Sequence, residues 1–119
     1  MLHKKINYLI GKEISHSQNL IFNDLAINFF SDLSSELKRN KSVLKSPDLF
    51  FLMMWCTKKN LIINKERYRI SSLRIGRGII FHICPSNVPL NFFYSFAYGL
   101  LSGNSNIVKL PSRNYLETN

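Results

Sequence analysis

The sequence has few of the features that define several large protein classes. Its 119 residues include only two cysteines, Cys56 and Cys84, which form neither a CxxC metal pair nor a disulfide framework. The longest uninterrupted apolar run, residues 49–56, is far below the roughly 20 residues that span a bilayer. The basic N-terminus is not followed by an apolar core and a small-residue cleavage site. We therefore expect a cytoplasmic protein with reduced cysteines, no membrane span and no metal site.

Acidic residues are also scarce. The chain has 7 Asp and Glu and 16 Lys and Arg, which gives a formal net charge of +9. Such a charge attracts anionic partners through long-range electrostatics. The basic residues are scattered, however, and no aromatic residues alternate with them to form a stacking platform for bases. We favour an ordinary solvated surface and expect no nucleic acid partner. A small basic module that binds nucleic acid or another anion is the alternative.

The first 66 residues are expected to form a helical segment with two amphipathic helices. The first helix is predicted over residues 17–39, and its apolar stripe repeats every four residues. That stripe consists of Ile21, Leu25, Phe29, Leu33 and Leu37, widened by Phe22, Ala26 and Phe30. The second helix is predicted from the cap Ser46 and the first-turn Pro47 to about Lys59. Its Met and aromatic residues are interpreted as core packing, not as an acyl pocket.

Residues 67–119 are expected to begin a cofactor-binding domain that is incomplete in this chain. Residues 67–75 alternate loosely and predict an extended arm or a short strand pair. The pattern that follows predicts a strand over residues 78–84, a turn over 85–89, a helix over 90–102, a turn over 104–106 and a strand over 107–110. The expected fold class is therefore α/β, a partial Rossmann-type βαβ unit preceded by two amphipathic helices.

A helix of this length joins two parallel strands by a right-handed crossover. Ligands of open parallel sheets bind beyond the carboxyl ends of the strands. Asn87 and residues 109–112 follow those ends, so we expect them on one rim of the sheet. The N-terminus of the crossover helix, just after Asn87, adds a partial positive charge that suits phosphate.

Several further residue predictions concern this unit. His82 lies in the buried strand and is interpreted as a packed histidine. Gly99 is costly inside a helix, which a close approach of helix and sheet would offset, and Gly103 suits a left-handed helix cap. The glycines at 76 and 78 precede the strand, whereas a dinucleotide fingerprint requires them after it, so that interpretation is rejected.

The segment from 83 to 89, Ile-Cys-Pro-Ser-Asn-Val-Pro, and the segment from 100 to 112, Leu-Leu-Ser-Gly-Asn-Ser-Asn-Ile-Val-Lys-Leu-Pro-Ser, carry a resemblance. They resemble the cofactor-binding start of the aldehyde dehydrogenase superfamily, and more closely the acyl-CoA reductases of the LuxC type, which make long-chain aldehydes in bacterial luminescence. The strong similarity covers residues 74–113. The resemblance implies an oxidoreductase that reduces a fatty acyl thioester, on CoA or on a protein, with NADPH.

The resemblance also implies roles for individual residues. Asn87 matches the asparagine whose amide holds the carbonyl oxygen as it becomes an oxyanion, a role that suits a donor that does not titrate. Lys109 and Ser112 match residues that contact the adenosine ribose or the 2′-phosphate of NADPH, and Pro85 and Ser86 are included in the cofactor-binding turn.

In that family a downstream cysteine attacks the thioester, and no such cysteine region is present in this chain. We therefore expect an N-terminal fragment that is inactive alone, and whose two-stranded sheet leaves open edges and an uncovered apolar face. An acyl-transferring partner protein and an oligomer are compatible with this interpretation. A noncatalytic interaction subunit that pairs its open edge with a second chain is the other alternative.

Overall fold

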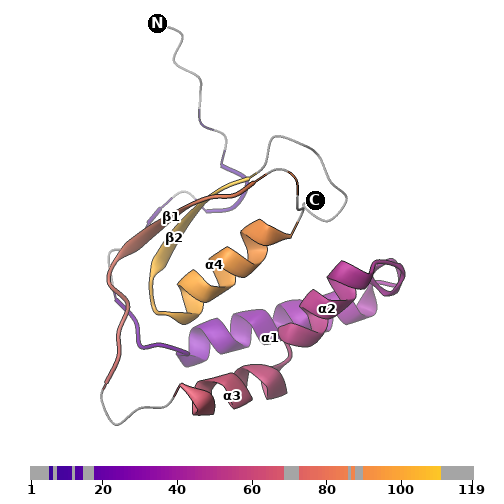
Figure 1. Ribbon diagram of the computed structural model, residues 1–119, viewed down its shortest axis with the longest axis horizontal. Helices are drawn as coiled ribbons and strands as arrows, with labels where there is room; N and C mark the ends of the chain where they lie inside the picture. The colour runs from indigo at the N-terminus through magenta and orange to yellow at the C-terminus, as the bar shows by residue number, and fades with distance from the viewer. Residues whose placement is uncertain are drawn as a thin grey trace, which may run out of the picture.

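The computed structural model describes residues 6, 8–11, 13–14, 18–68, 73–85, 87 and 90–110. Their elements, in chain order, are α1 (Asp24–Arg39), the 3₁₀ turn η1 (Val43–Lys45), α2 (Pro47–Trp55), α3 (Lys58–Arg67), β1 (Ile79–Ile83), α4 (Asn91–Leu101) and β2 (Ser105–Lys109). Helix α4 lies between the two strands and α1, and α1 also contacts α2 and α3 (Figure 1). The described chain therefore forms three layers: the two-stranded sheet, the crossover helix α4, and a helical base that consists of α1, α2 and α3.

Strands β1 and β2 pair in parallel, with Ile79 opposite Ser105 and Ile83 opposite Lys109. They are joined through α4, so the predicted βαβ unit and the α/β fold class are confirmed. The second strand begins two residues earlier than predicted, at Ser105. The backbone N–H of Ser105 donates to the carbonyl of Gly78 at 2.9 Å, which extends the pairing into the segment that we expected to be a turn.

The apolar run at residues 78–84 has the composition of a strand buried on both faces of a sheet, but within the described part of the chain the sheet is covered on one face only. Successive residues of a strand point to opposite faces. On the face toward α4, His82 is buried and Ile80 is half-buried. On the other face, Ile79, Phe81 and Ile83 are exposed. The uncovered apolar face that we expected of a two-stranded parallel sheet is therefore present, and it begins within β1 itself.

Helix α1 begins at Asp24, so the predicted start near residue 17 is wrong; residues 15–17 themselves lie outside the described part. Asn23 caps the helix, because its side-chain oxygen accepts from the backbone N–H of Ala26 at 3.0 Å. The preceding residues are tied to the sheet layer instead. Leu20 forms an isolated antiparallel bridge with Ile75, and the N–H of Phe22 donates to the carbonyl of Leu101 at 2.7 Å.

The buried face of α1 is rotated relative to the predicted stripe. Leu25 is 80% exposed and Phe29 is 48% exposed, whereas Phe30 is fully buried. The helix packs against α2, α3 and α4 together, and this sandwiched position selects a different set of core residues. The buried residues are Ala26, Ile27, Phe30 and Ser34, with Leu33 and Leu37 packed against the core.

The second predicted helix, expected to reach Lys59, is divided into α2 and α3. Helix α2 ends at Trp55, and Thr57 then adopts an extended conformation and caps α3, its hydroxyl accepting from the N–H of Asn60 at 3.4 Å. The side-chain amide of Asn60 in turn donates to the carbonyl of Trp55 at 2.8 Å. Three α-helices therefore precede the βαβ unit within the described residues. The predicted arm begins as helix, since Arg67 closes α3, and residues 69–72 lie outside the described part.

The core lies where the helical base meets α4. Phe30 is its centre, because its ring makes edge-on contacts with Trp55, Phe93 and Phe96 at centroid distances of 5.9 to 6.4 Å. Such contacts add about 0.5–1.5 kcal/mol each beyond the burial of apolar area. Buried residues of every helix join this cluster, which consists of Ala26, Ile27, Phe30, Leu52, Cys56, Leu61, Leu90, Ala97 and Leu101.

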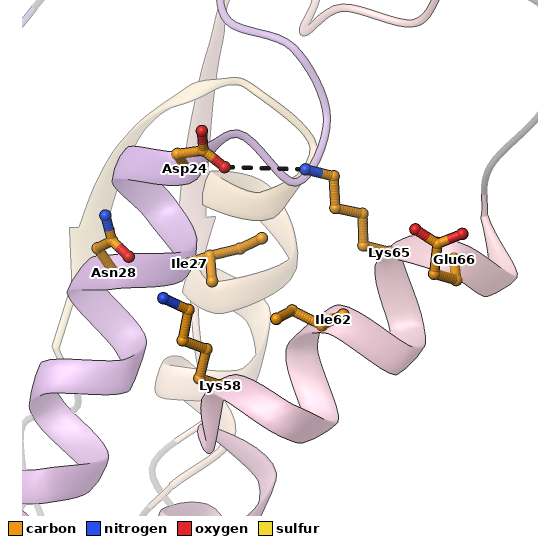
Figure 2. A pocket seen from close by; sticks show the side chains of 7 residues that line it. All are labelled: Asp24, Ile27, Asn28, Lys58, Ile62, Lys65 and Glu66. Carbon is orange, nitrogen blue, oxygen red and sulfur yellow. Dashed lines mark ion pairs between the residues drawn. The ribbon is translucent and has the colours of Figure 1, made fainter.

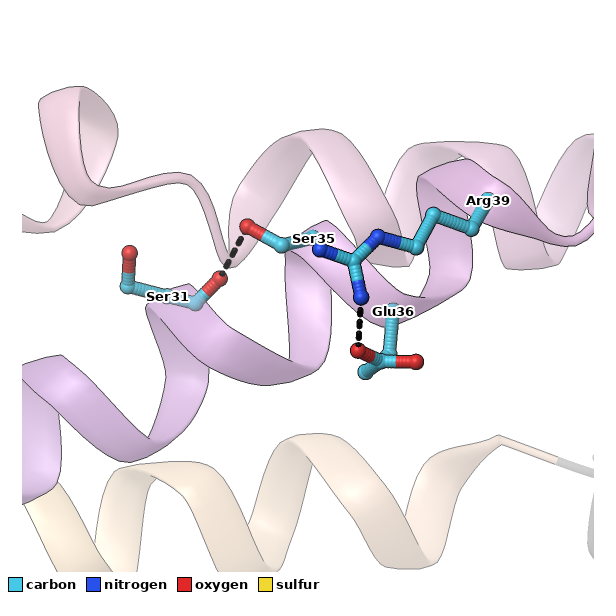
Figure 3. Close-up of polar contacts among 4 residues, drawn as sticks. All are labelled: Ser31, Ser35, Glu36 and Arg39. Atoms are coloured by element: carbon cyan, nitrogen blue, oxygen red, sulfur yellow. Dashed lines mark hydrogen bonds and ion pairs between the residues drawn. The ribbon is translucent and has the colours of Figure 1, made fainter.

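One side of α1 is an ordinary polar surface. The hydroxyl of Ser35 donates to the carbonyl of Ser31 at 3.1 Å, and Arg39 pairs with Glu36 at 2.6 Å (Figure 3). Both members of this ion pair are largely solvent-exposed, so the pair adds little to stability.

Candidate functional site

The carboxyl ends of β1 and β2 meet at one edge of the sheet. Ile83, the last residue of β1, is the register partner of Lys109, the last residue of β2. The chain leaves β1 at this edge through Cys84, Pro85 and Asn87, and the last two of these residues are exposed. Lys109 is also exposed. The parallel register therefore sends the turn that carries Asn87 out from the edge at which Lys109 ends β2, as the sequence predicted.

Helix α4 begins at the same edge. Its N-cap position is Leu90, whose side chain makes no capping hydrogen bond, and its first turn contains no acidic residue. The first backbone N–H groups of a helix have no partner within the helix and carry a partial positive charge. The edge thus combines a lysine side chain, an exposed asparagine and the positive end of a helix dipole.

Two of the predicted cofactor-binding residues, Ser86 and Ser112, lie outside the described residues. Of the predicted site, Pro85, Asn87 and Lys109 are therefore placed. Asn87 lies four residues beyond β1, and Lys109 is inside β2.

A hydrogen-bonded polar network lies beneath this edge, between α4 and the sheet. His82 is 7% exposed; its Nε2 lies 2.8 Å from Oδ1 of Asn106, and its Nδ1 lies 2.7 Å from Oγ of Ser95. The amide nitrogen of Asn106 donates to the carbonyl of Asn104 at 2.9 Å, which fixes the amide orientation. Because an amide oxygen only accepts, Nε2 of His82 carries the proton.

The network continues to the start of β1. The side-chain oxygen of Asn104 accepts from the backbone N–H groups of Arg77 at 2.6 Å and Gly78 at 3.1 Å. One chain of hydrogen bonds therefore links β1, α4, β2 and the segment before β1. His82 is a packed histidine, as predicted, whereas Asn104 was expected in a simple turn. The signal that would have found it is an Asn directly after a helix-capping glycine and before a buried strand.

The glycines of this unit permit the close packing that the network needs. A Cβ atom at Gly99 would meet the side chain of Asn106, so only glycine allows α4 to approach the sheet at this point. This confirms the predicted close approach. Gly103 has φ +83°, which confirms the left-handed cap.

The hydrogen bonds connect Ser95, His82 and Asn106 in the order of a nucleophile, a base and an orienting amide. Ser95 nevertheless lies inside α4, where the surrounding backbone N–H groups donate within the helix. Those N–H groups cannot also stabilise an oxyanion, which acyl transfer to a serine requires. We therefore assign the three residues a structural role.

Neither cysteine is arranged as a nucleophile. Cys56 is fully buried, and desolvation raises the pKa of its thiol to about 12. Cys84 is half-buried at the end of β1, and burial raises its pKa as well. The thiolate is the reactive form, so both residues are poorly suited to attack a thioester.

A surface hollow of about 450 Å³ lies elsewhere, between α1 and α3 (Figure 2). Ile27 and Ile62 line it together with charged side chains, and Lys65 pairs there with Asp24 at 3.8 Å. The backbone N–H of Phe22 donates to the carbonyl of Leu101, the last residue of α4, so the start of α1 lies near the amino ends of the strands. This hollow is therefore at the opposite end of the unit from Asn87 and Lys109.

Among the described residues, no group of three His, Cys, Asp or Glu could hold a metal ion, and no helix is long and apolar enough to cross a membrane.

The family model for acyl-CoA reductase (LuxC) matches residues 50–116, which is more than half of the chain and includes the whole βαβ unit. No curated protein and no solved structure matches the chain. The match also includes most of α2, all of α3 and every residue of the predicted site. This chain belongs to the acyl-CoA reductase (LuxC) family.

Proposed function

We propose that this chain supplies the cofactor-binding edge and the oxyanion-holding asparagine of a reductase that converts a fatty acyl thioester to an aldehyde with NADPH. The observation that carries the proposal is the parallel register of β1 and β2, with Ile83 opposite Lys109. The family match over residues 50–116 supports the same reaction class.

Lys109 and the start of α4 suit the phosphate groups of a dinucleotide. An exposed lysine is a mobile point charge, and an uncapped helix N-terminus offers backbone N–H donors to an anion. The residues at this edge therefore fit NADPH, which supplies the hydride when bound. Lys109 would hold its ribose or 2′-phosphate end, and Pro85, Ser86 and Ser112 are proposed to contact the cofactor as well.

Asn87 is suited to the thioester carbonyl. It is exposed beyond the carboxyl end of β1, and its amide N–H can donate to an oxygen that becomes negatively charged. An amide does not change its protonation state near neutral pH, so the donor is present throughout the reaction. Removing one such donor costs about 10²–10³-fold in turnover.

The chain alone is proposed to lack reductase activity. The covalent step requires a thiolate, and the burial of Cys56 and Cys84 raises the pKa of both thiols. Incubation with a fatty acyl-CoA and NADPH should give neither an acylated protein nor NADPH oxidation. Acylation of Cys84 would overturn this part of the proposal.

Cofactor binding can be measured on the chain itself by calorimetric titration with NADPH. Lys109→Ala should weaken binding about fivefold or more, because a charge-assisted contact to phosphate is lost. Lys38→Ala is the matched control, since Lys38 is an exposed lysine at the end of α1 and the charge change is the same. Equal effects of the two substitutions would show that the net charge, not the site, attracts the cofactor.

The role of Asn87 can be tested by co-expressing the chain with the cysteine-bearing part of a reductase of this family. The pair should oxidise NADPH in the presence of a fatty acyl-CoA. Asn87→Ala should lower that rate by about 100-fold and leave NADPH affinity unchanged. Asn28→Ala, at an exposed asparagine of α1 far from this edge, is the control. A rate unaffected by Asn87→Ala would refute the oxyanion role.

A further inference from the structure

One side-chain hydrogen bond joins α4 to β1 close to the proposed cofactor edge. Because Nε2 of His82 carries the proton, its Nδ1 is the acceptor, and the hydroxyl of Ser95 donates to it at 2.7 Å. His82 is the last residue but one of β1, and Ser95 lies in the first half of α4. The bond is therefore near both the carboxyl end of β1 and the N-terminus of α4.

Ser95 does not make the hydrogen bond that other helical serines of this chain make. A serine hydroxyl inside a helix can donate to the carbonyl four residues earlier. Ser35 donates in this way to Ser31 at 3.1 Å, and Ser102 donates to Tyr98 at 2.6 Å. The hydroxyl of Ser95 is directed to the sheet instead. Its bond can therefore orient α4 relative to β1, which a bond within the helix cannot do.

A second contact, one helical turn further along α4, completes the attachment to the sheet. Gly99 lies four residues after Ser95 and so on the same face of the helix. A Cβ atom at Gly99 would meet Oδ1 of Asn106, and this oxygen also accepts from Nε2 of His82 at 2.8 Å. Two contacts along one helix face restrict both the direction of α4 and its sliding over the strands.

The contacts on the other side of α4 are apolar. Ala97 belongs to the core cluster, and Phe93 and Phe96 make edge-on contacts with Phe30. Apolar contact holds the helix on the core but lacks the directionality of a hydrogen bond. Loss of the Ser95 hydroxyl should therefore leave α4 folded and attached, with its N-terminus less accurately placed.

We propose that Ser95 and His82 are positioning residues that place the N-terminus of α4 relative to Asn87 and Lys109 and thereby set the affinity for NADPH. The proposal rests on the proposed function of this edge. Asn91, the first residue of α4, is four residues before Ser95, so a shift at Ser95 is carried directly to the first-turn N–H groups. Binding groups need to be held within about 0.5 Å of their productive positions. Both residues act through the helix and not by contact with the cofactor.

Substitutions at Ser95 separate positioning from stability. Ser95→Ala removes the hydroxyl, and NADPH affinity measured by calorimetric titration should fall about fivefold. Its urea unfolding midpoint should stay close to that of the unsubstituted chain, because Ser95 is exposed and the gain in helix propensity offsets the lost bond. Ser95→Thr keeps the hydroxyl and should keep the affinity, although threonine has a lower helix propensity than alanine.

Ser102→Ala is the matched control, since Ser102 is exposed at the other end of α4 and its hydroxyl donates to Tyr98 within the same helix. This substitution should leave NADPH affinity unchanged. Residual dipolar couplings of the backbone amides, measured without cofactor, report the direction of α4 relative to β1 and β2. Ser95→Ala should change the couplings of α4, whereas Ser95→Thr and Ser102→Ala should not.

Three results would overturn the proposal. The first is equal NADPH affinity of Ser95→Ala and the unsubstituted chain, and the second is a set of α4 couplings that Ser95→Ala leaves unchanged. The third is a loss of affinity that Ser95→Thr shares, because the hydroxyl would then not be its cause. Failure of the unsubstituted chain to bind NADPH would refute the proposed function, and the couplings would still support or refute the placement of α4 by Ser95. The two failures are therefore distinguishable.

Discussion

Polar groups are buried on one face of the β1–β2 sheet, and apolar groups are exposed on the other face. The face covered by α4 carries His82 and Asn106, which are polar and hydrogen-bonded. The uncovered face carries Ile79, Phe81 and Ile83, which are apolar and exposed. Free energy of apolar burial alone would favour the opposite arrangement.

The polar face and the apolar face of the sheet therefore have different roles. The polar groups on the covered face fix how α4 crosses the sheet, because hydrogen bonds have direction whereas apolar contacts do not. That crossing positions the turn with Asn87 relative to Lys109. We infer that the covered face orients the site.

The largest effect is expected at His82. His82→Ala should lower the free energy of unfolding by about 3 kcal/mol, since it leaves a cavity and removes the partner of the Asn106 amide oxygen. His82→Gln, which can still donate, should recover part of this loss. Urea unfolding followed by circular dichroism measures both. Equal stability of His82→Ala and the unsubstituted chain would show that the network does not hold the unit together.

A smaller effect is expected at Gly99. Alanine gains about 1 kcal/mol in helix propensity, but its Cβ must displace the Asn106 side chain at a cost of about 1–3 kcal/mol. The net loss should be about 1 kcal/mol. In an Asn106→Ala background the closest obstacle is absent and only Nε2 of His82, at 3.1 Å, still crowds the added Cβ, so Gly99→Ala should cost less than in the unsubstituted chain. An unchanged cost in that double-mutant cycle would place the close approach elsewhere.

The smallest effect is expected at Phe81, the neighbour of His82 on the opposite face. Phe81→Ser should change the free energy of unfolding by less than about 0.5 kcal/mol, because a largely exposed side chain loses little on truncation. A loss comparable to that of His82→Ala would show that the face that carries Phe81 is already covered in the isolated chain.

Local patterns predicted the βαβ unit well because each of its parts carries its own signal. The proline-flanked turn ends β1, Gly103 caps α4, and the apolar run before Pro111 marks β2. Parallel pairing then follows from the length of the crossover helix. The placement of Asn87 beyond β1 and of Lys109 at the end of β2 was predictable on the same basis. Their roles in binding and catalysis stay predictions.

The parts that sequence reasoning missed depend on contacts between distant segments. The start of α1 follows the pairing of Leu20 with Ile75, a contact between distant segments, although its cap Asn23 is a local signal. The division between α2 and α3 depends on Thr57, a modest capping signal within an otherwise helical stretch. The exposure of Phe81 could not be read from the composition of β1, because an apolar run looks the same whether one face or both are covered.

The central claim is that the strand ends with Asn87 and Lys109 form one NADPH-binding edge. Amide resonances of the chain, followed by nuclear magnetic resonance during NADPH titration, test it most directly. The account predicts that the largest shifts fall on Asn87, Lys109 and the first turn of α4, and that Lys109→Glu suppresses them. Shifts confined to the hollow between α1 and α3, or an absence of shifts at the strand ends under saturating NADPH, would contradict the account.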